Sequence, residues 1–240
     1  MNRLKYLLPL AVLVVLTGGL AYWSTNHNRA EIATATTPDN PDAALQALRD
    51  GNQRFVDSRR TLSTDTAHDA EFRHRTAKGQ HPFAAILCCS DSRVCPEFIF
   101  DQRAGSIFEI RNAGNVVDED VLASLEYAVE HLHVPLIVIL GHKGCGAIEA
   151  VCEAGEQPLH DHLRALQTHM QGIHKQVLEC NHRHDAEVVN RLAQENAKQQ
   201  ALTVLRDSQP LKTAVDRGEV RLVYGLYDME TGAVAFFDLP

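Results

Sequence analysis

Short apolar runs alternate with amphipathic stretches along most of the chain. Three continuous runs predict buried strands: PFAAILCCS, SIFEIRN and the β-branched VPLIVILGH. VLASLEYAVEHLH and GAIEAVCEAG predict helices, and residues 159–207 are helical in pattern with one polar face. GEVRLVYGLYDMETGAVAFFD predicts a fourth strand, a turn at 230–232 and a short return strand.

This alternation predicts an α/β fold, with a central, mostly parallel β-sheet flanked by helices. Before the first strand, PDAALQALRDGNQRFVDS predicts an N-terminal helical arm, because its apolar residues share helical spacing. In such sheets, ligands bind just beyond the carboxyl ends of the strands. Polar residues at those ends are therefore the first candidates for a functional site.

The beginning of the chain has a different pattern. Arg3 and Lys5 precede an uncharged run at 6–23, so residues 1–23 predict a signal peptide or an N-terminal membrane anchor. As an anchor, a helix of this run at ~1.5 Å per residue barely spans a hydrocarbon core of ~30 Å. Residues 24–41 are polar, small and proline-containing, so we expect a linker there. We expect the folded domain at 42–240. Either outcome predicts export, to the periplasm or the outer face of the inner membrane.

Composition narrows the classes of partner. The chain has 240 residues, 45% of them apolar, and a formal net charge of −8. We expect no nucleic-acid partner, because binding to nucleic acid needs a basic face. Six histidines predict a solvated helix face rather than a second metal site, because no third ligand accompanies any pair of them. They are His160, His162, His169, His174, His182 and His184.

Two predicted strand ends carry groups suited to chemistry. GHKGCG places His142 and Cys145 in a strand-to-helix turn, and CCSDSRVCPE places Cys89, Asp91 and Arg93 after another strand. One histidine, two cysteines and a nearby carboxylate suit Zn²⁺, which takes sulfur and nitrogen ligands in a tetrahedron. Three protein ligands and an exchangeable fourth position would make the site catalytic. The alternative is that the cysteines are buried as small hydrophobes and that Asp91 and Arg93 form a plain ion pair.

The motifs CSDSRVCPE, RNAGN, SLEYAVEHL and GHKGCGAI resemble, in this order, those of the β-class carbonic anhydrases. The resemblance runs from LRDGNQRFV to VYGLYDMETG and covers nearly the whole predicted domain. It implies that Cys89, His142 and Cys145 bind one Zn²⁺ per chain. It also implies that Asp91 and Arg93 form a catalytic dyad. Some members have a closed, inactive state, in which Asp91 would take the fourth zinc position here.

The resemblance also implies a substrate pocket of the plant-like type, at a dimer interface. Gln80 would donate a hydrogen bond to a substrate oxygen, while Phe108 and Tyr127 would form an apolar wall for CO₂; for those two, ordinary core packing is the alternative. The implied assembly is a homodimer or a higher even-numbered homo-oligomer. The implied reaction is reversible hydration of CO₂ to bicarbonate and a proton through a zinc-bound hydroxide.

Two other functions stay open at this point. One is hydrolysis of COS or CS₂ by the same fold, and the other is a non-catalytic zinc-binding or thiol-redox role. Asp91, Arg93 and Gln80 argue against the second, because neither zinc binding nor disulfide exchange needs them. An oxidising compartment favours disulfides among the remaining cysteines, but the sequence does not choose among the three full pairings. These cysteines are Cys88, Cys95, Cys152 and Cys180.

Overall fold

The computed structural model describes residues 37–61, 70–173 and 185–240, and the chain from Pro38 onward forms one compact unit. The predicted leader and most of the predicted linker lie outside the described residues. In the described ranges, no helix has the length and apolar character needed to cross a membrane. Cys180 and three of the histidines also lie outside: His174, His182 and His184.

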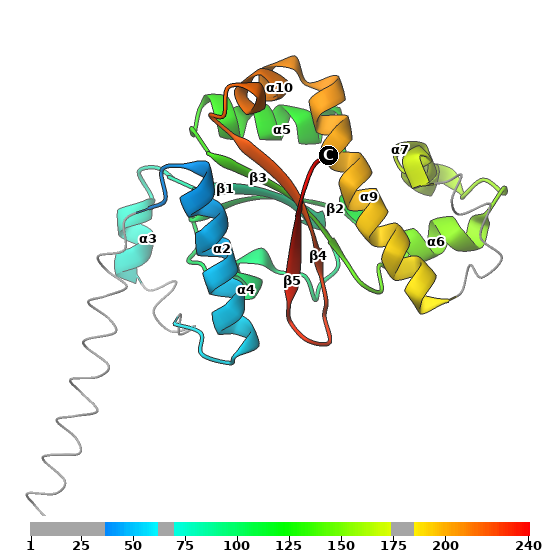
Figure 1. The fold of residues 1–240 in the computed structure, drawn as a ribbon, viewed down its shortest axis with the longest axis horizontal. Coiled ribbons are helices and arrows are strands. Elements are labelled where there is room, and N and C mark those ends of the chain that lie inside the picture. The colour runs from blue at the N-terminus through cyan, green and yellow to red at the C-terminus, as the bar shows by residue number, and fades with distance from the viewer. Residues whose placement is uncertain (1–36, 62–69, 174–184) are drawn as a thin grey trace, which may run out of the picture. The chain divides into compact units, whose positions relative to one another are not determined.

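A five-stranded sheet forms the centre of this unit (Figure 1), in the order β2-β1-β3-β4-β5. The first four strands are parallel and the fifth is antiparallel to β4. This confirms the predicted mostly parallel sheet and the predicted return strand. The strands are β1 (Ala84–Cys89), β2 (Ile107–Asn112), β3 (Leu136–His142), β4 (Arg221–Tyr227) and β5 (Val234–Asp238).

Helices cover both faces of the sheet, as predicted. One face packs against α2 (Pro41–Val56) and α4 (Pro96–Ile99). The other packs against α5 (Glu119–Glu130), α9 (Ala186–Asp207) and α10 (Gln209–Asp216). The remaining helical elements are α3 (Ala70–Thr76), α6 (Gly146–Ala154) and α7 (Arg164–His169), with the 3-10 turns η1 (Ala113–Asn115) and η2 (Asp161–Leu163).

The N-terminal helix α2 begins at Pro41. The side chain of Asn40 accepts a hydrogen bond from the backbone N–H of Ala43 (2.9 Å), which satisfies one of the free donors at the helix start. Proline is suited to this first helical position because it has no N–H to leave unpaired. Local chemistry thus fixes where the predicted helical arm starts.

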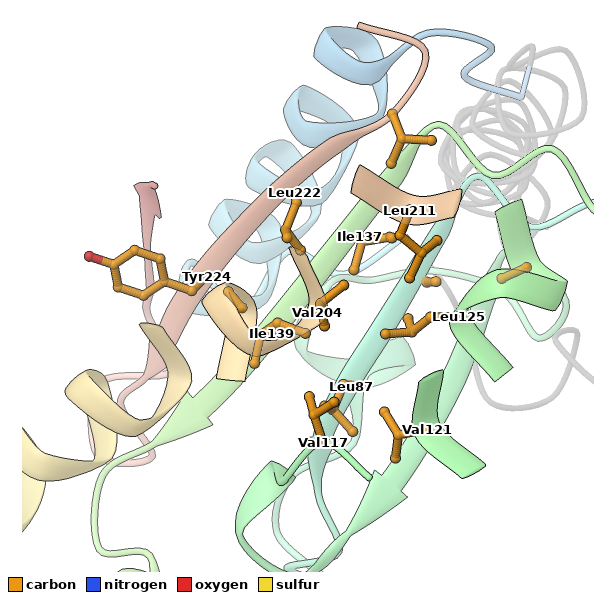
Figure 2. Packing of buried hydrophobic residues seen from close by; sticks show 14 of the residues in the cluster. Leu87, Val117, Val121, Leu125, Ile137, Ile139, Val204, Leu211, Leu222 and Tyr224 are labelled. Carbon is orange, nitrogen blue, oxygen red and sulfur yellow. The ribbon is translucent and has the colours of Figure 1, made fainter. Parts of the chain in front are cut away.

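The side chains of the central strands point alternately to two core layers. Leu87 and Ile139 face the layer of α5, α9 and α10, where Figure 2 shows them beside Leu125 and Val204. Cys88 faces the other layer, with α2 and α4. All six residues of β1 are buried, which explains a continuous rather than an alternating apolar run. Cys88 is therefore a core side chain, and burial raises the pKa of its thiol.

A pair of carboxyl groups lies between β2 and α4. Burial, followed by a hydrogen bond with the Glu97 carboxyl group, raises the pKa of Glu109 to about 8. Glu109 Oε1 is buried and has no hydrogen-bond partner, and Cys95 Sγ lies 3.7 Å from Glu97 Oε2. Two carboxylates this close resist ionising together, so the pair holds a proton at neutral pH.

We predict that Glu109→Gln gains stability relative to the wild type as the pH rises. The folded-state pKa of Glu109 lies above its ordinary value of 4.5. Its protonation therefore contributes stability that is fully present below about pH 4.5 and is lost as the pH rises through about 8. Glutamine does not titrate. The melting temperature of the variant minus that of the wild type should become more positive from pH 5 to pH 9.

The matched control is Glu156→Gln, which makes the same change at an exposed position. Its difference from the wild type should stay nearly constant over the same pH range. A constant difference for Glu109→Gln as well would contradict the shared proton.

Candidate metal centre

Three potential metal ligands meet at the carboxyl edge of the sheet. Cys89 is the last residue of β1, His142 is the last residue of β3, and Cys145 is the N-cap of α6. Their ligand atoms all lie within 4.8 Å of one another, and all three residues are buried. Because β1 and β3 are parallel neighbours, both strands deliver their final side chains to the same edge.

The surroundings of the two sulfur atoms favour negative charge at this point. A hydrogen bond from the Cys145 thiol lowers the pKa of Cys89, against the effect of burial. The backbone N–H groups of Gly114 (N to Sγ 3.3 Å) and Asp91 also donate to the Cys89 sulfur. The same thiol–thiolate contact, together with burial, raises the pKa of Cys145. These contacts favour the thiolate form of Cys89.

The imidazole of His142 is fixed in its orientation. Nδ1 lies 2.9 Å from the carbonyl oxygen of Lys143, to which it can donate a hydrogen bond. Nε2 is buried and makes no hydrogen bond of good geometry, although it lies near the Cys89 sulfur. A buried polar atom without a partner is unfavourable, and a cation between this nitrogen and the two sulfurs would satisfy it. Two sulfurs and one imidazole nitrogen fit Zn²⁺, which leaves a fourth position for another ligand.

Asp91 and Arg93 form a two-point ion pair beside these ligands. Arg93 Nε donates to Asp91 Oδ1 (2.9 Å) and Nη2 donates to Oδ2 (2.7 Å), while the backbone N–H of Arg93 also donates to Oδ1. The Arg93 guanidinium holds the pKa of Asp91 well below its usual range. The side chain of Asp91 is 16% exposed and that of Arg93 is 61% exposed.

The three predicted pocket residues lie elsewhere in the chain. The rings of Phe108 and Tyr127 are 6.2 Å apart. Phe108 pairs with Ala85 in the sheet, four residues before Cys89, which separates them by ~13 Å at ~3.3 Å per residue. Tyr127 is 46% exposed, so core packing does not account for it. Gln80 is exposed in the loop before the amino end of β1. The structure thus brings together the predicted ligands and dyad, but not these residues.

Two kinds of site residue were missed by sequence reasoning. Arg111 donates to the carbonyl oxygens of Cys89 (3.3 Å) and Asp91 (2.9 Å) and so braces the loop between them. On α9, Asn196 and Gln200 are buried, although residues 159–207 were predicted only to be helical with one polar face. The available signal was their four-residue spacing alongside the apolar Ala197 and Ala201, which places amides on the buried side of a helix.

Comparison with known sequences gives consistent matches. The family model described as carbonic anhydrase matches residues 84–234. The chain is 50% identical over 115 residues to carbonic anhydrase 2 of Mycobacterium tuberculosis, covering 48% of this chain and 54% of that protein. It thus spans about half the length of this relative. It is 30% identical over 210 residues to a carbonic anhydrase of Synechocystis, covering 81% of this chain and 71% of that protein.

Solved structures share the fold described above. The β-carbonic anhydrase CcaA superposes with a TM-score of 0.64 at 28% identity, covering 81% of this chain and 87% of that chain. A tetrameric β-carbonic anhydrase of Sordaria macrospora gives a TM-score of 0.63 at 26% identity, covering 70% and 87%. The family match contains all three candidate ligands and the Asp91–Arg93 pair. From its sequence match and its fold, the chain belongs to the β-carbonic anhydrase family.

Proposed function

We propose that the protein is a zinc-dependent carbonic anhydrase, which converts CO₂ and water reversibly to bicarbonate and a proton. The observation that carries the proposal is the position of the Asp91–Arg93 pair beside the cluster of Cys89, His142 and Cys145. Zinc storage or thiol exchange needs the cluster but not an ionised carboxylate held at two points. The names of the relatives support the same activity.

The two cysteines and the histidine would hold one zinc ion per chain. When bound, zinc would act as a Lewis acid that lowers the pKa of a water molecule toward ~7 and so provides a nucleophile for CO₂. The chain prepares for this ion by fixing Nδ1 of His142 on the Lys143 carbonyl group and by donating backbone N–H groups to the Cys89 sulfur. Both arrangements leave the metal-binding atoms pointed at one another.

Asp91 and Arg93 have complementary tasks in this proposal. Oδ1 of Asp91 already accepts two hydrogen bonds from Arg93, whereas Oδ2 accepts one and keeps a lone pair. Asp91 can therefore accept a hydrogen bond from the reacting water through Oδ2 and orient it toward CO₂. Arg93 keeps Asp91 ionised and turned away from the metal position. Without Arg93, Asp91 would be free to become a fourth metal ligand and close the site.

We further propose that a second copy of the chain completes the pocket. Phe108 lies too far along the sheet to reach the centre of its own chain. Tyr127, whose ring is 6.2 Å from that of Phe108, is 46% exposed and so open to a partner. In a homodimer or larger even-numbered homo-oligomer, these rings and Gln80 would serve the metal centre of the partner. The tetrameric relatives from Sordaria macrospora support this assembly.

Purified protein should contain one zinc per chain, and Cys145→Ser should lose most of it. A serine hydroxyl is a far weaker zinc ligand than a thiolate, so the variant keeps only two of the three proposed ligands. Elemental analysis gives the zinc content, and circular dichroism checks the fold. Cys95→Ser is the control with the same substitution, because Cys95 lies outside the cluster. Full zinc content in Cys145→Ser would refute the ligand assignment.

Arg93→Ala should retain zinc but lose CO₂ hydration by ~10²–10⁴-fold, as expected for a lost proton-handling group. The loss should be largest at low pH, because hydroxide then competes least with Asp91 for the metal. Arg93→Lys should recover little, because an ammonium lacks the planar fork that fixes a carboxylate. Stopped-flow rates from pH 6 to 9, with zinc measured in the same samples, give the result.

Arg217→Ala is the control for that experiment, because Arg217 is an exposed arginine at the C-cap of α10, where it forms only a long ion pair with Glu219 (3.9 Å). It should keep both zinc and rate. Near-normal hydration by zinc-loaded Arg93→Ala would show that the dyad is a surface ion pair. Wild-type protein that hydrolyses COS but does not hydrate CO₂ would instead support the alternative substrate.

We propose that the folded domain is exported, because Arg3 and Lys5 precede the uncharged run at 6–23. A reporter enzyme fused after residue 41 should be active only on the outer side of the membrane. Replacing Leu13 and Val14 with arginine in the same fusion should abolish export, because charges interrupt the apolar run. Reporter activity inside the cell from the unmodified fusion would argue against the proposal.

A further inference from the structure

One helix, α9, holds the turn that carries Cys145 and the segment that donates a hydrogen bond to Cys89. Asn190 Oδ1 accepts a hydrogen bond from the backbone N–H of Gly144, which directly precedes Cys145 (2.9 Å). Asn196 Nδ2 donates to the carbonyl oxygen of Gly114 (2.9 Å). The N–H of the same Gly114 donates to the Cys89 sulfur. A short path of hydrogen bonds therefore runs from the middle of α9 to one of the sulfur atoms.

The backbone of Gly114 has a conformation that other residues rarely adopt. Its φ of +74° is in the left-handed region, and a Cβ atom built there would lie 2.2 Å from Met170 Cε. Glycine adopts this φ without strain, but by itself it holds its conformation weakly. The amide of Asn196 restrains the carbonyl side of this residue, while its N–H side faces Cys89.

The orientation of the Asn196 amide is itself set by a neighbour. Gln200 Nε2 donates to Asn196 Oδ1 (3.1 Å), so Nδ2 is the atom turned toward Gly114. Gln200 is fixed in turn, because its Oε1 accepts from the Val117 N–H (2.7 Å) and its Nε2 donates to the His169 carbonyl oxygen (2.9 Å). Asn196 is 1% exposed and Gln200 is 2% exposed, so water does not compete with these contacts.

We propose that Asn196 is a positioning residue for the metal-binding thiolate of Cys89. By holding the carbonyl group of Gly114, it keeps the Gly114 N–H directed at the sulfur. A hydrogen bond to a thiolate withdraws electron density from sulfur, and thereby tunes how the sulfur donates to a metal. The inference rests on the proposed function, because it requires Cys89 to be a ligand.

A purely structural role for Asn196 makes a different prediction. Loss of a buried amide then lowers the melting temperature and changes nothing at the metal. A positioning role instead changes the sulfur–metal bond itself. The two roles are separated by a spectroscopic signature of that bond and by the rate at which the metal leaves, both measured well below the melting temperature.

The test uses Asn196→Leu, which keeps the approximate size of the side chain but removes its donor. In the cobalt(II)-substituted full chain, the thiolate-to-cobalt charge-transfer band should move to lower energy, because the sulfur lone pairs lose a hydrogen bond. Losing a group that orients a metal ligand usually weakens metal affinity ~10–100-fold. Zinc transfer from the zinc-loaded variant to a chromogenic chelator should be faster by about that factor, because the weaker affinity is expected in the release rate. Asn196→Ala should behave in the same way, and carries the test if the leucine variant does not fold.

Ser208→Ala is the matched control. Ser208 is as buried as Asn196, and its hydroxyl donates to Glu126 Oε1 (2.6 Å), but it lies at the junction of α9 and α10. This variant should lower the melting temperature without moving the band or the release rate. Asn196 variants that match Ser208→Ala in both readouts would overturn the inference and leave the metal centre intact. Wild-type protein that binds neither zinc nor cobalt would overturn the proposed function itself.

Discussion

The parallel pairing of β1 with β3 is the constraint on which the candidate site depends. Leu140 lies opposite Cys88, so the two strands run in step and end together. In an antiparallel pair, Cys89 and His142 would lie at opposite ends of strands six and seven residues long, ~20 Å apart at ~3.3 Å per residue. The turn after β3 then brings Cys145 to the same edge. This turn needs a left-handed backbone conformation at Gly144 (φ +59°), which glycine adopts without steric strain.

Charge balance explains why Asp91 needs Arg93. Zn²⁺ and two thiolates would sum to no net charge, so the metal itself would attract the nearby carboxylate of Asp91. The guanidinium competes with the metal for this carboxylate, because it binds both carboxylate oxygens. Because most of the Arg93 side chain is exposed, solvent screens the pair, and its contribution to stability is small. Its effect is on the orientation of Asp91 and on the low pKa of that carboxyl group.

The sequence was sufficient to predict where the strands lie along the chain, because continuous apolar runs leave few alternatives. It was also sufficient to predict Cys89, His142 and Cys145 as ligands, because their motifs follow strands of one sheet. It was insufficient where a tertiary contact reverses the local pattern. Glu109 interrupts the apolar run of β2, and nothing in that run shows that the carboxyl group of Glu97 on α4 lies beside it. The polar side chain of Asn196 predicts a position on the polar face of the helix, but it lies on the side of α9 that contacts η1. The distance between Phe108 and Cys89 depends on register, which periodicity alone does not give.

The close approach of α9 to the sheet links packing with the site. A Cβ atom at Gly141 of β3 would lie 2.9 Å from the carbonyl oxygen of Ala193, so helix and strand are almost in backbone contact beside His142. Only at that separation can side chains as short as Asn190 and Asn196 reach the loops at the strand ends. The helix that buries the apolar face of the sheet is thus also the support of the candidate ligands. Because ligand geometry and packing share one element, a metal bound to the folded state alone would stabilise that packing, and loosening α9 would weaken metal binding by the same linkage.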